Sequence, residues 1–316
     1  MIFFNQDKQL EQLGNSILEA TWAALPTLNR DQIALTWIVY DPPVLVNTGG
    51  ALTPNAFWSH PVRGFAYRGA ERIYPASVVK LFYLVAINEW LEKGMTSSNK
   101  ELERAIRNMI VDSSNDATSL VIDILSGTTS GPELSTGPFE TWKYQRNIVN
   151  RYFQSLGWLE MEKINVCQKT WYDGCDGAYG RERAFVGELL ENRNMVTTNA
   201  IARLLHSIVG GVAVSSERSQ AMMALMKRSL NVNELPQNFE EDQIRGFLGG
   251  SLPQEAQIWS KAGWTSQVRH DAAYIELPDK RPYLLVVFTE GKAIAYNRDI
   301  LPFVSQQVAE AISSLG

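Results

Sequence analysis

The stretch Tyr74–Ile87, YPASVVKLFYLVAI, begins with small and polar residues and becomes continuously apolar after Lys80. Ser77 and Lys80 are three residues apart, so in a helix that starts near Ser77 their side chains share one face. Serine needs a nearby base to become a nucleophile, and a lysine can be that base when burial lowers its pKa. Alone, however, the pattern favours a helix N-cap serine followed by a surface lysine whose stem covers apolar side chains.

The segments around this stretch predict an α+β fold. An amphipathic helix over residues 10–22 precedes an alternating strand over 33–39 and a short strand over 64–69. Helical periodicity follows, and three consecutive strands and a last helix complete the pattern. The helical segments lie near residues 77–93, 100–110, 116–125, 140–156 and 198–209, the strands within 256–263, 268–277 and 283–291, and the last helix within 296–314. This order predicts an antiparallel sheet flanked by terminal helices, with an all-helical lobe inserted between its strands. We expect residues 1–76 and 212–316 to form the sheet lobe, and residues 77–211 the helical lobe.

Composition narrows the class of protein. The 316 residues carry a net charge of −5 with the basic residues scattered, which disfavours nucleic-acid or anionic-membrane binding. No apolar run is long enough to span a membrane, and the N-terminus lacks the basic region of a signal peptide. We therefore expect a cytoplasmic monomer, or a periplasmic or secreted one if a leader has been removed. Of the two cysteines, Cys167 and Cys175, we expect free thiols in preference to a loop disulfide.

Two further short motifs complement Ser77 and Lys80. Ser113-Ser114-Asn115 lies between two predicted helices, where a hydroxyl and an amide could relay a proton and hold an acyl group's amide. By itself this motif fits an N-cap cluster better. Lys261-Ala262-Gly263 lies in a predicted strand, where small residues let a substrate approach closely. The N–H of Trp264 could then form an oxyanion hole with that of Ser77.

Together the three motifs, in this order, resemble the penicillin-recognising serine hydrolases, which include class A β-lactamases and D-alanyl-D-alanine peptidases. Their signature is S-x-x-K, then S-D-N, then K-T-G. The predicted order of helices and strands matches that group from about residue 30 to the end of the chain.

The resemblance implies a role for each matching position. Ser77 would be the acylated nucleophile and Lys80 its base, and Ser113 would carry the proton to the leaving nitrogen. Asn115 would bind the substrate amide, and Lys261 the substrate carboxylate. Arg269 is a candidate second carboxylate anchor, with His270 as the competing choice and a solvated strand arginine as an equal alternative. No cofactor or metal is implied.

The sequence departs from the group's pattern in three places. Ser114 replaces the usual aspartate of the middle motif. Ala262 stands where a hydroxyl residue is usual, so one hydrogen-bond donor to a carboxylate is lost unless Thr265 or Ser266 replaces it.

The third departure concerns the base that releases the acyl group, since no E-x-x-L-N loop is present. Counting back from the helix that begins near residue 197 indicates Glu182, and counting forward leads to Gln168, which cannot act as a base. Glu188 has the right spacing from Asn192 but lies too close to the helix. The alternative is that these glutamates are only solvated.

These observations predict a serine hydrolase that forms an acyl-enzyme on Ser77, most of all a β-lactamase acting on amide or β-lactam substrates. A first alternative is a D-alanyl-D-alanine carboxypeptidase or esterase that releases penicillins slowly. Further alternatives are a glutaminase-like amidohydrolase and a non-catalytic binding domain on the same fold.

Overall fold

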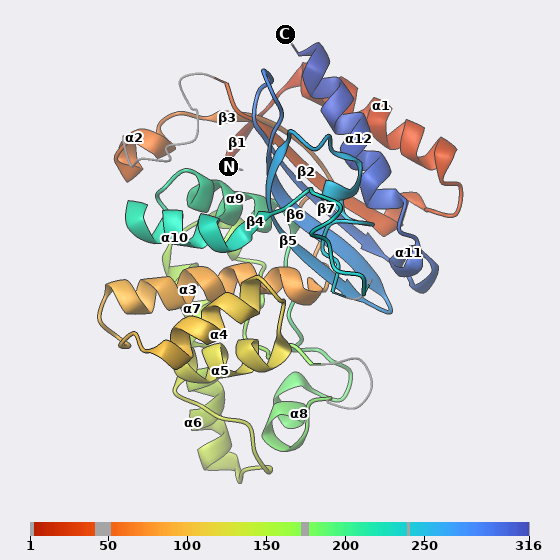
Figure 1. The fold of residues 1–316 in the computed structure, drawn as a ribbon. Helices are drawn as coiled ribbons and strands as arrows, with labels where there is room; N and C mark the ends of the chain where they lie inside the picture. The colour runs from red at the N-terminus through yellow and green to blue at the C-terminus, as the bar shows by residue number, and fades with distance from the viewer. Residues whose placement is uncertain (1–2, 42–51, 172–176, 239–240, 316) are drawn as a thin grey trace.

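The computed structural model describes residues 3–41, 52–171, 177–238 and 241–315. Strands come from both ends of the chain, and most of the helices lie between them (Figure 1). The strands are β1 (Phe4–Gln6), β2 (Ile33–Val39), β3 (Val62–Tyr67), β4 (Lys227–Arg228), β5 (Gln257–Thr265), β6 (Val268–Glu276) and β7 (Tyr283–Glu290). The α-helices are α1 (Lys8–Ala24), α2 (Pro54–Trp58), α3 (Lys80–Glu92), α4 (Lys100–Ile110), α5 (Asn115–Ser126), α6 (Thr136–Arg146), α7 (Ile148–Ser155), α8 (Gly180–Val186), α9 (Thr198–Val209), α10 (Ser216–Met226), α11 (Lys292–Tyr296) and α12 (Ile300–Ser314). The 3₁₀ helices are η1 (Arg30–Gln32), η2 (Ala76–Val79), η3 (Leu159–Met161) and η4 (Leu248–Ser251).

The described strands form one sheet in the order β1-β3-β2-β7-β6-β5-β4. Every neighbouring pair is antiparallel except β1 and β3, which are parallel. The strands β5, β6 and β7 follow one another in sequence and in space, because only short turns connect them. The α+β class and the antiparallel meander near the C-terminus were therefore predicted correctly.

Helices cover both faces of the sheet. On one face α1 and α12 pack against each other and α1 packs against β3, and Leu35 and Trp37 of β2 belong to the same apolar cluster as the buried residues of both helices. On the other face α9 crosses β2, β6 and β7, and α3 continues the same apolar core (Figure 1). Residues of β2 are buried on both faces, so the strand has no solvated side. The predicted division into a sheet lobe and a helical lobe stays a prediction.

Several boundaries differ from the sequence analysis. The helix expected over 140–156 is two helices, α6 and α7, which meet at Asn147. The last helix is likewise preceded by a separate short one, α11. The sequence analysis missed β1 and β4, which have three and two residues and carry too little periodicity to detect.

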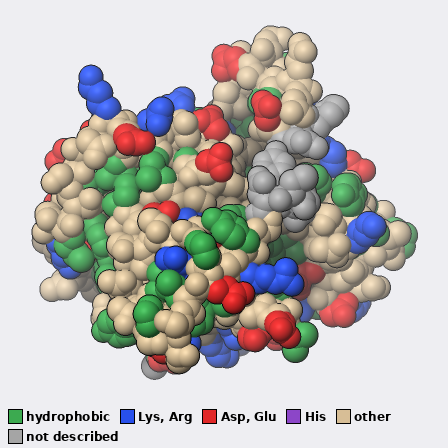
Figure 2. All heavy atoms as spheres, turned by 90° about the horizontal axis from the view of Figure 1, so that it is seen from below, with side chains coloured by type: hydrophobic (Ala, Val, Ile, Leu, Met, Phe, Trp, Pro, Cys, Tyr) green, Lys and Arg blue, Asp and Glu red, His purple; other side chains and the backbone are tan. Residues whose placement is uncertain are grey.

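No helix of the described residues is both long and apolar enough to cross a membrane. On the face drawn in Figure 2, acidic and basic side chains are interspersed. Cys167 is buried with a free thiol, whose pKa burial raises to about 12, while Cys175 lies outside the described residues.

Candidate active site

The segment that carries Ser77 is held against the sheet by two neighbouring strands. Ser77 lies in η2, directly after Ala76, which has a φ of +46°. This is a conformation that residues other than glycine adopt rarely and at a cost. A Cβ atom at Gly263 of β5 would lie 2.9 Å from the Pro75 carbonyl oxygen and 3.0 Å from the Ser77 amide nitrogen. Only glycine therefore lets β5 approach the nucleophile segment this closely.

A buried histidine on β6 holds the same segment from the second side. The His270 Nε2 atom lies 2.9 Å from the Tyr74 carbonyl oxygen, and its Nδ1 atom accepts from the Thr289 amide at 3.0 Å. Since Nδ1 accepts, Nε2 carries the proton and donates to Tyr74. Burial lowers the pKa of His270 to about 4, so the ring is neutral near pH 7.

Lys80 is the first residue of α3 and is fully buried, in agreement with the apolar run around it. Its Nζ atom donates to the Ser113 carbonyl oxygen, to the Asn115 Oδ1 atom at 2.9 Å and to the Ser113 Oγ atom at 3.3 Å. No carboxylate of the described residues forms an ion pair with it. Desolvation without a compensating charge lowers the pKa of Lys80 to about 7. A snorkelling surface lysine is thereby excluded.

Lys261 of β5 reaches the same hydroxyl from the opposite side. Its Nζ atom donates to the Ser113 Oγ atom at 2.9 Å, the Gln243 Oε1 atom at 3.1 Å and the Ala262 carbonyl oxygen at 2.8 Å. Burial, together with the charges of Lys80 and Arg228, lowers the pKa of Lys261 well below its usual value. The structure therefore brings Lys80, Ser113 and Lys261 together around one hydroxyl group.

Ser113 owes its position to the turn between α4 and α5. It has a φ of +56°, and the next residue, Ser114, caps α5 by accepting from the Ala117 amide at 3.1 Å. Ser114 thus has a local structural role, whereas Ser113 and Asn115 point to the lysines. The alternative interpretation of the motif as an N-cap cluster accounts for Ser114 alone.

Ala262 and Trp264 point to the other face of β5. Ala262 is buried in the apolar cluster that includes α12 and η4 residues, which explains a small apolar residue at this position. The Trp264 indole donates to the Ala295 carbonyl oxygen at 3.0 Å. The hydroxyl of Thr265, a proposed substitute, accepts from the Gln267 amide in the turn after the strand.

Arg269 lies on this same face, because it is directly opposite Trp264 in the β5–β6 register. Its Nε atom donates to the Ala295 carbonyl oxygen at 2.8 Å, and its guanidinium stacks on Phe247. Burial lowers the pKa of Arg269 to about 10. The structure brings Arg269 beside the Trp264 ring, but on the face of the sheet opposite to Lys80, Ser113 and Lys261. Strand alternation places His270 on the nucleophile side instead, where both ring nitrogens are already bonded.

Glu182 belongs to a buried ionic network in the helical part of the chain. Its Oε1 atom accepts from Arg146 at 2.5 Å and from the Ser130 hydroxyl at 2.8 Å. Lys169 joins the network through Asp123 at 2.8 Å. None of the hydrogen bonds among the described residues connects Glu182 to Ser77 or Lys80. The role of Glu182 as deacylating base stays a prediction.

The competing candidates for that role have different surroundings. Glu188 is exposed in the turn after α8. Gln168 is buried, and its backbone is held by Asn194 at both its amide and its carbonyl group. The Tyr83 hydroxyl also donates to the Gln168 carbonyl oxygen at 2.7 Å, which ties this loop to α3.

Sequence reasoning missed Gln243 and Arg228. Arg228 of β4 donates to the carbonyl oxygens of Ile110 and Val111 at the end of α4, at 2.8 and 3.1 Å. Gln243 donates to Val111 at 2.8 Å and accepts from Lys261. These two residues fasten the Ser113 turn to the sheet. They lie outside any motif, so no sequence signal identifies them.

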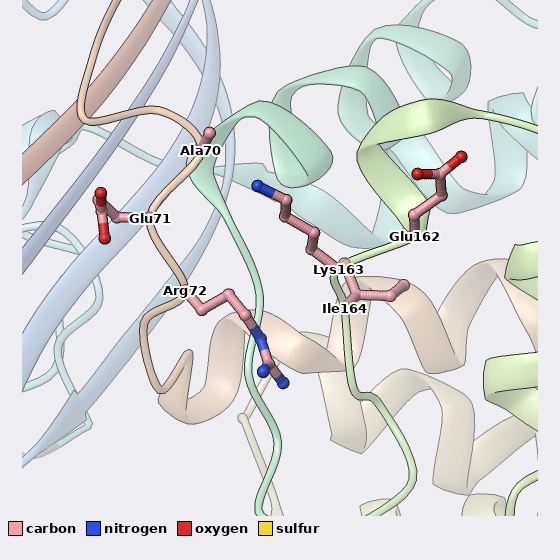
Figure 3. Close-up of a pocket in the computed structure, with 6 residues that line it drawn as sticks. All are labelled: Ala70, Glu71, Arg72, Glu162, Lys163 and Ile164. Atoms are coloured by element: carbon pink, nitrogen blue, oxygen red, sulfur yellow. The ribbon is translucent and has the colours of Figure 1, made fainter.

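A separate hollow is lined by Ala70, Glu71, Arg72, Glu162, Lys163 and Ile164, from the segment before Ile73 and the one after η3 (Figure 3). None of the predicted site residues lines it.

Comparison with known proteins identifies the same group of enzymes that the three motifs resemble. The sequence model described as "Beta-lactamase enzyme family" matches residues 97–316. This range includes Ser113, Asn115 and Lys261 but begins after Ser77 and Lys80. Comparison with curated protein sequences gives no match.

Solved structures resemble this one along nearly the whole chain. A β-lactamase from Sphaerobacter thermophilus has a TM-score of 0.63 and 18% identity, covering 96% of this chain and 98% of its own. A mutant of PBP-A, solved as an acyl-enzyme complex with penicillin G, has a TM-score of 0.65 and 16% identity, covering 98% of both chains. A β-lactamase from Xanthomonas campestris pv. campestris has a TM-score of 0.60 and 16% identity, covering 94% of this chain and 98% of its own. At these identities the likeness is one of fold.

Proposed function

Because the chain belongs to the beta-lactamase enzyme family, we propose that it is a serine hydrolase that forms an acyl-enzyme on Ser77 with β-lactam amides. The observation that carries this proposal is the Ser113 hydroxyl, which lies 3.3 Å from one lysine nitrogen and 2.9 Å from another. Two buried lysines that share a serine hydroxyl and have no ion-paired carboxylate are costly for stability alone. They are suited to moving a proton.

Acylation would proceed in steps that the site residues can perform. Neutral Lys80 accepts the Ser77 hydroxyl proton, and the Ser77 Oγ atom bonds to the amide carbonyl carbon. The Ser77 and Trp264 amides stabilise the oxyanion. The C–N bond then breaks, and the leaving nitrogen takes a proton from Ser113, which Lys80 reprotonates. Asn115 donates its amide N–H to the substrate.

The test is covalent labelling with benzylpenicillin, followed by intact-protein and peptide mass spectrometry. We expect one adduct of the full penicillin mass on the peptide containing Ser77, and none in Ser77→Ala. The matched pair Ser113→Ala and Ser114→Ala tests the relay, because only Ser113 touches the lysines. Slower acylation in Ser113→Ala alone is expected. An adduct that persists in Ser77→Ala would refute the nucleophile assignment.

One observation favours a second candidate, a D-alanyl-D-alanine carboxypeptidase-like or esterase-like enzyme that releases penicillin slowly. The Glu182 Oε1 atom accepts from Arg146 and Ser130 within an ionic network, while Oε2 has no hydrogen-bond partner among the described residues. The lifetime of the adduct separates the two candidates. A lifetime of hours supports slow release, and turnover that Glu182→Gln abolishes supports a lactamase with Glu182 as its base.

A further inference from the structure

Lys261 has no N–H left for a substrate. A lysine ammonium has three donors, and those of Lys261 point to three internal acceptors: Ser113 Oγ, Gln243 Oε1 and the Ala262 carbonyl oxygen. The Gln243 amide has only one reasonable orientation here. Its oxygen faces the donors of Lys261 and Arg228, while its nitrogen faces the Val111 carbonyl oxygen.

The other cations of this part of the sheet also form internal hydrogen bonds, although the buried Arg228 Nε atom has no partner among the described residues. Arg228 donates to the carbonyl oxygens that end α4. Arg269 lies on the opposite face and donates to Ala295. At the nucleophile, Lys80 makes three hydrogen bonds of its own.

Residues outside the described ranges do not supply a replacement. Residues 1–2, 42–51, 172–176, 239–240 and 316 contain no lysine, arginine or histidine side chain. The position after Lys261 is Ala262, which has no hydroxyl and is buried against the other face of the sheet. A substrate carboxylate that binds Lys261 would therefore have to displace one of its internal hydrogen bonds.

We infer that this site does not select for a substrate carboxylate and accepts uncharged esters and amides, including lactams, as readily as carboxylated ones. The inference rests on the proposed Ser77 acyl-enzyme. In this inference, the Gln243 side-chain oxygen is the acceptor that occupies the third N–H of Lys261.

The experiment compares benzylpenicillin with its methyl ester, which lacks the negative charge of the carboxylate and carries one additional methyl group. The second-order acylation rate constant of the full chain is measured for each by intact-protein mass spectrometry. For the natural sequence we expect a ratio of acid to ester within about threefold of one. One hydrogen bond from a charged donor would change the ratio by about tenfold or more.

Two variants of Gln243 form a matched pair. Both lose the contact with Val111, but Gln243→Met also removes the acceptor of Lys261, whereas Gln243→Glu keeps it and adds a negative charge. We expect Gln243→Met to raise the ratio about tenfold, because a Lys261 N–H becomes available to the acid. In Gln243→Glu the ratio should stay the same or fall.

Each outcome has one meaning. Acylation by the acid more than about tenfold faster in the natural sequence overturns the inference and leaves the proposed function intact. An unchanged ratio in Gln243→Met overturns the part assigned to Gln243. If neither compound forms an adduct at Ser77, the proposed function fails, and the inference fails with it.

Discussion

Two buried groups of charged side chains in this molecule are built in opposite ways. Around Glu182, Arg146 and Lys169 are matched by two carboxylates, with ion pairs of 2.5 and 2.8 Å. Around Ser113, Lys80 and Lys261 hydrogen-bond to hydroxyl, amide and carbonyl oxygens, and neither forms an ion pair with a carboxylate of the described residues. The first group pairs each buried cation with a carboxylate, which offsets part of the cost of burying the charges. The second group contains no such ion pair, and burial lowers the pKa of Lys80 to about 7, so that this lysine loses its proton easily. The contrast separates a group that supports the fold from one that is suited to chemistry.

Replacing Lys80 should show the largest effect, and it should be on activity. In Lys80→Met we expect penicillin acylation to fall about 10³-fold, within the range typical of a lost general base. Stability should not fall, because the variant buries an apolar chain where a cation had no ion-pair partner. Acylation kinetics and urea unfolding measure the two effects, with the exposed Lys93→Met as control. A large loss of stability would put Lys80 in the same class as the ionic network.

Replacing Arg146 should mainly lower the stability of the fold. Arg146→Met leaves Glu182 buried without its nearest cation, which we expect to cost about 3–5 kcal/mol in the free energy of unfolding. The double variant Arg146→Met/Glu182→Leu should recover a large part of the lost free energy of unfolding, because neither member of the ion pair is then left without its partner. Urea denaturation of the three variants checks the order. If the double variant is as unstable as Arg146→Met, the network is not held by charge pairing.

Gly263→Ala tests the close approach of β5 to the nucleophile without changing any charge. Because the added methyl group meets backbone atoms, the segment or the strand must shift, at a cost of about 1–3 kcal/mol. We expect acylation to slow by about tenfold, since the Ser77 amide would move. Gly137→Ala, where an added Cβ meets nothing within 4 Å, is the control. Unaltered acylation would show that the spacing between β5 and Ser77 is not needed.

Without any substitution, acylation should depend on pH through Lys80. Protonated Lys80 cannot accept the Ser77 proton, and its pKa is about 7. The acylation rate constant should therefore rise about tenfold per unit as pH increases toward 7 and level off above it. Rate constants measured from pH 5 to 8.5 would test this. A profile that is flat over that range, or that has the same shape in Lys80→Met, would assign the proton transfer to another group.

Features that depend on the spacing of nearby residues could be predicted from the sequence. Ser77 and Lys80 lie at the start of a helix, and the segment around Lys261 has the alternation of a strand. The fold class and the candidate residues Ser77, Lys80 and Lys261 could therefore be predicted from the sequence. The side of a strand on which a residue lies depends on register. Arg269 looked like an anchor eight residues after Lys261, yet its pairing with Trp264 turns it away. Pairing β6 with β5 across the short turn would have placed Arg269 on the face opposite to Lys261, because side chains alternate along a strand.

Other features depend on distant contacts that a single sequence does not contain. Gln243 reaches Lys261 from a loop 18 residues earlier in the chain. The partners of Glu182 come from α6 and from the Ser130 loop, so its environment could not be deduced by counting from a neighbouring helix. Sequence reasoning therefore predicted which residues carry the chemistry, but not the hydrogen bonds between them.

The buried run that follows Lys80 also matters before the protein is folded. Leu81–Ile87, LFYLVAI, has no charge, no proline and several residues with high strand propensity, which is the composition of segments that aggregate when exposed. All seven residues are buried in α3, so a charge cannot be placed among them without damage to the core. Lys80 flanks the run and is the nearest charged residue to it, in the position of a gatekeeper that opposes intermolecular pairing. Replacing it should therefore lower the yield of refolding even where the folded protein loses no stability.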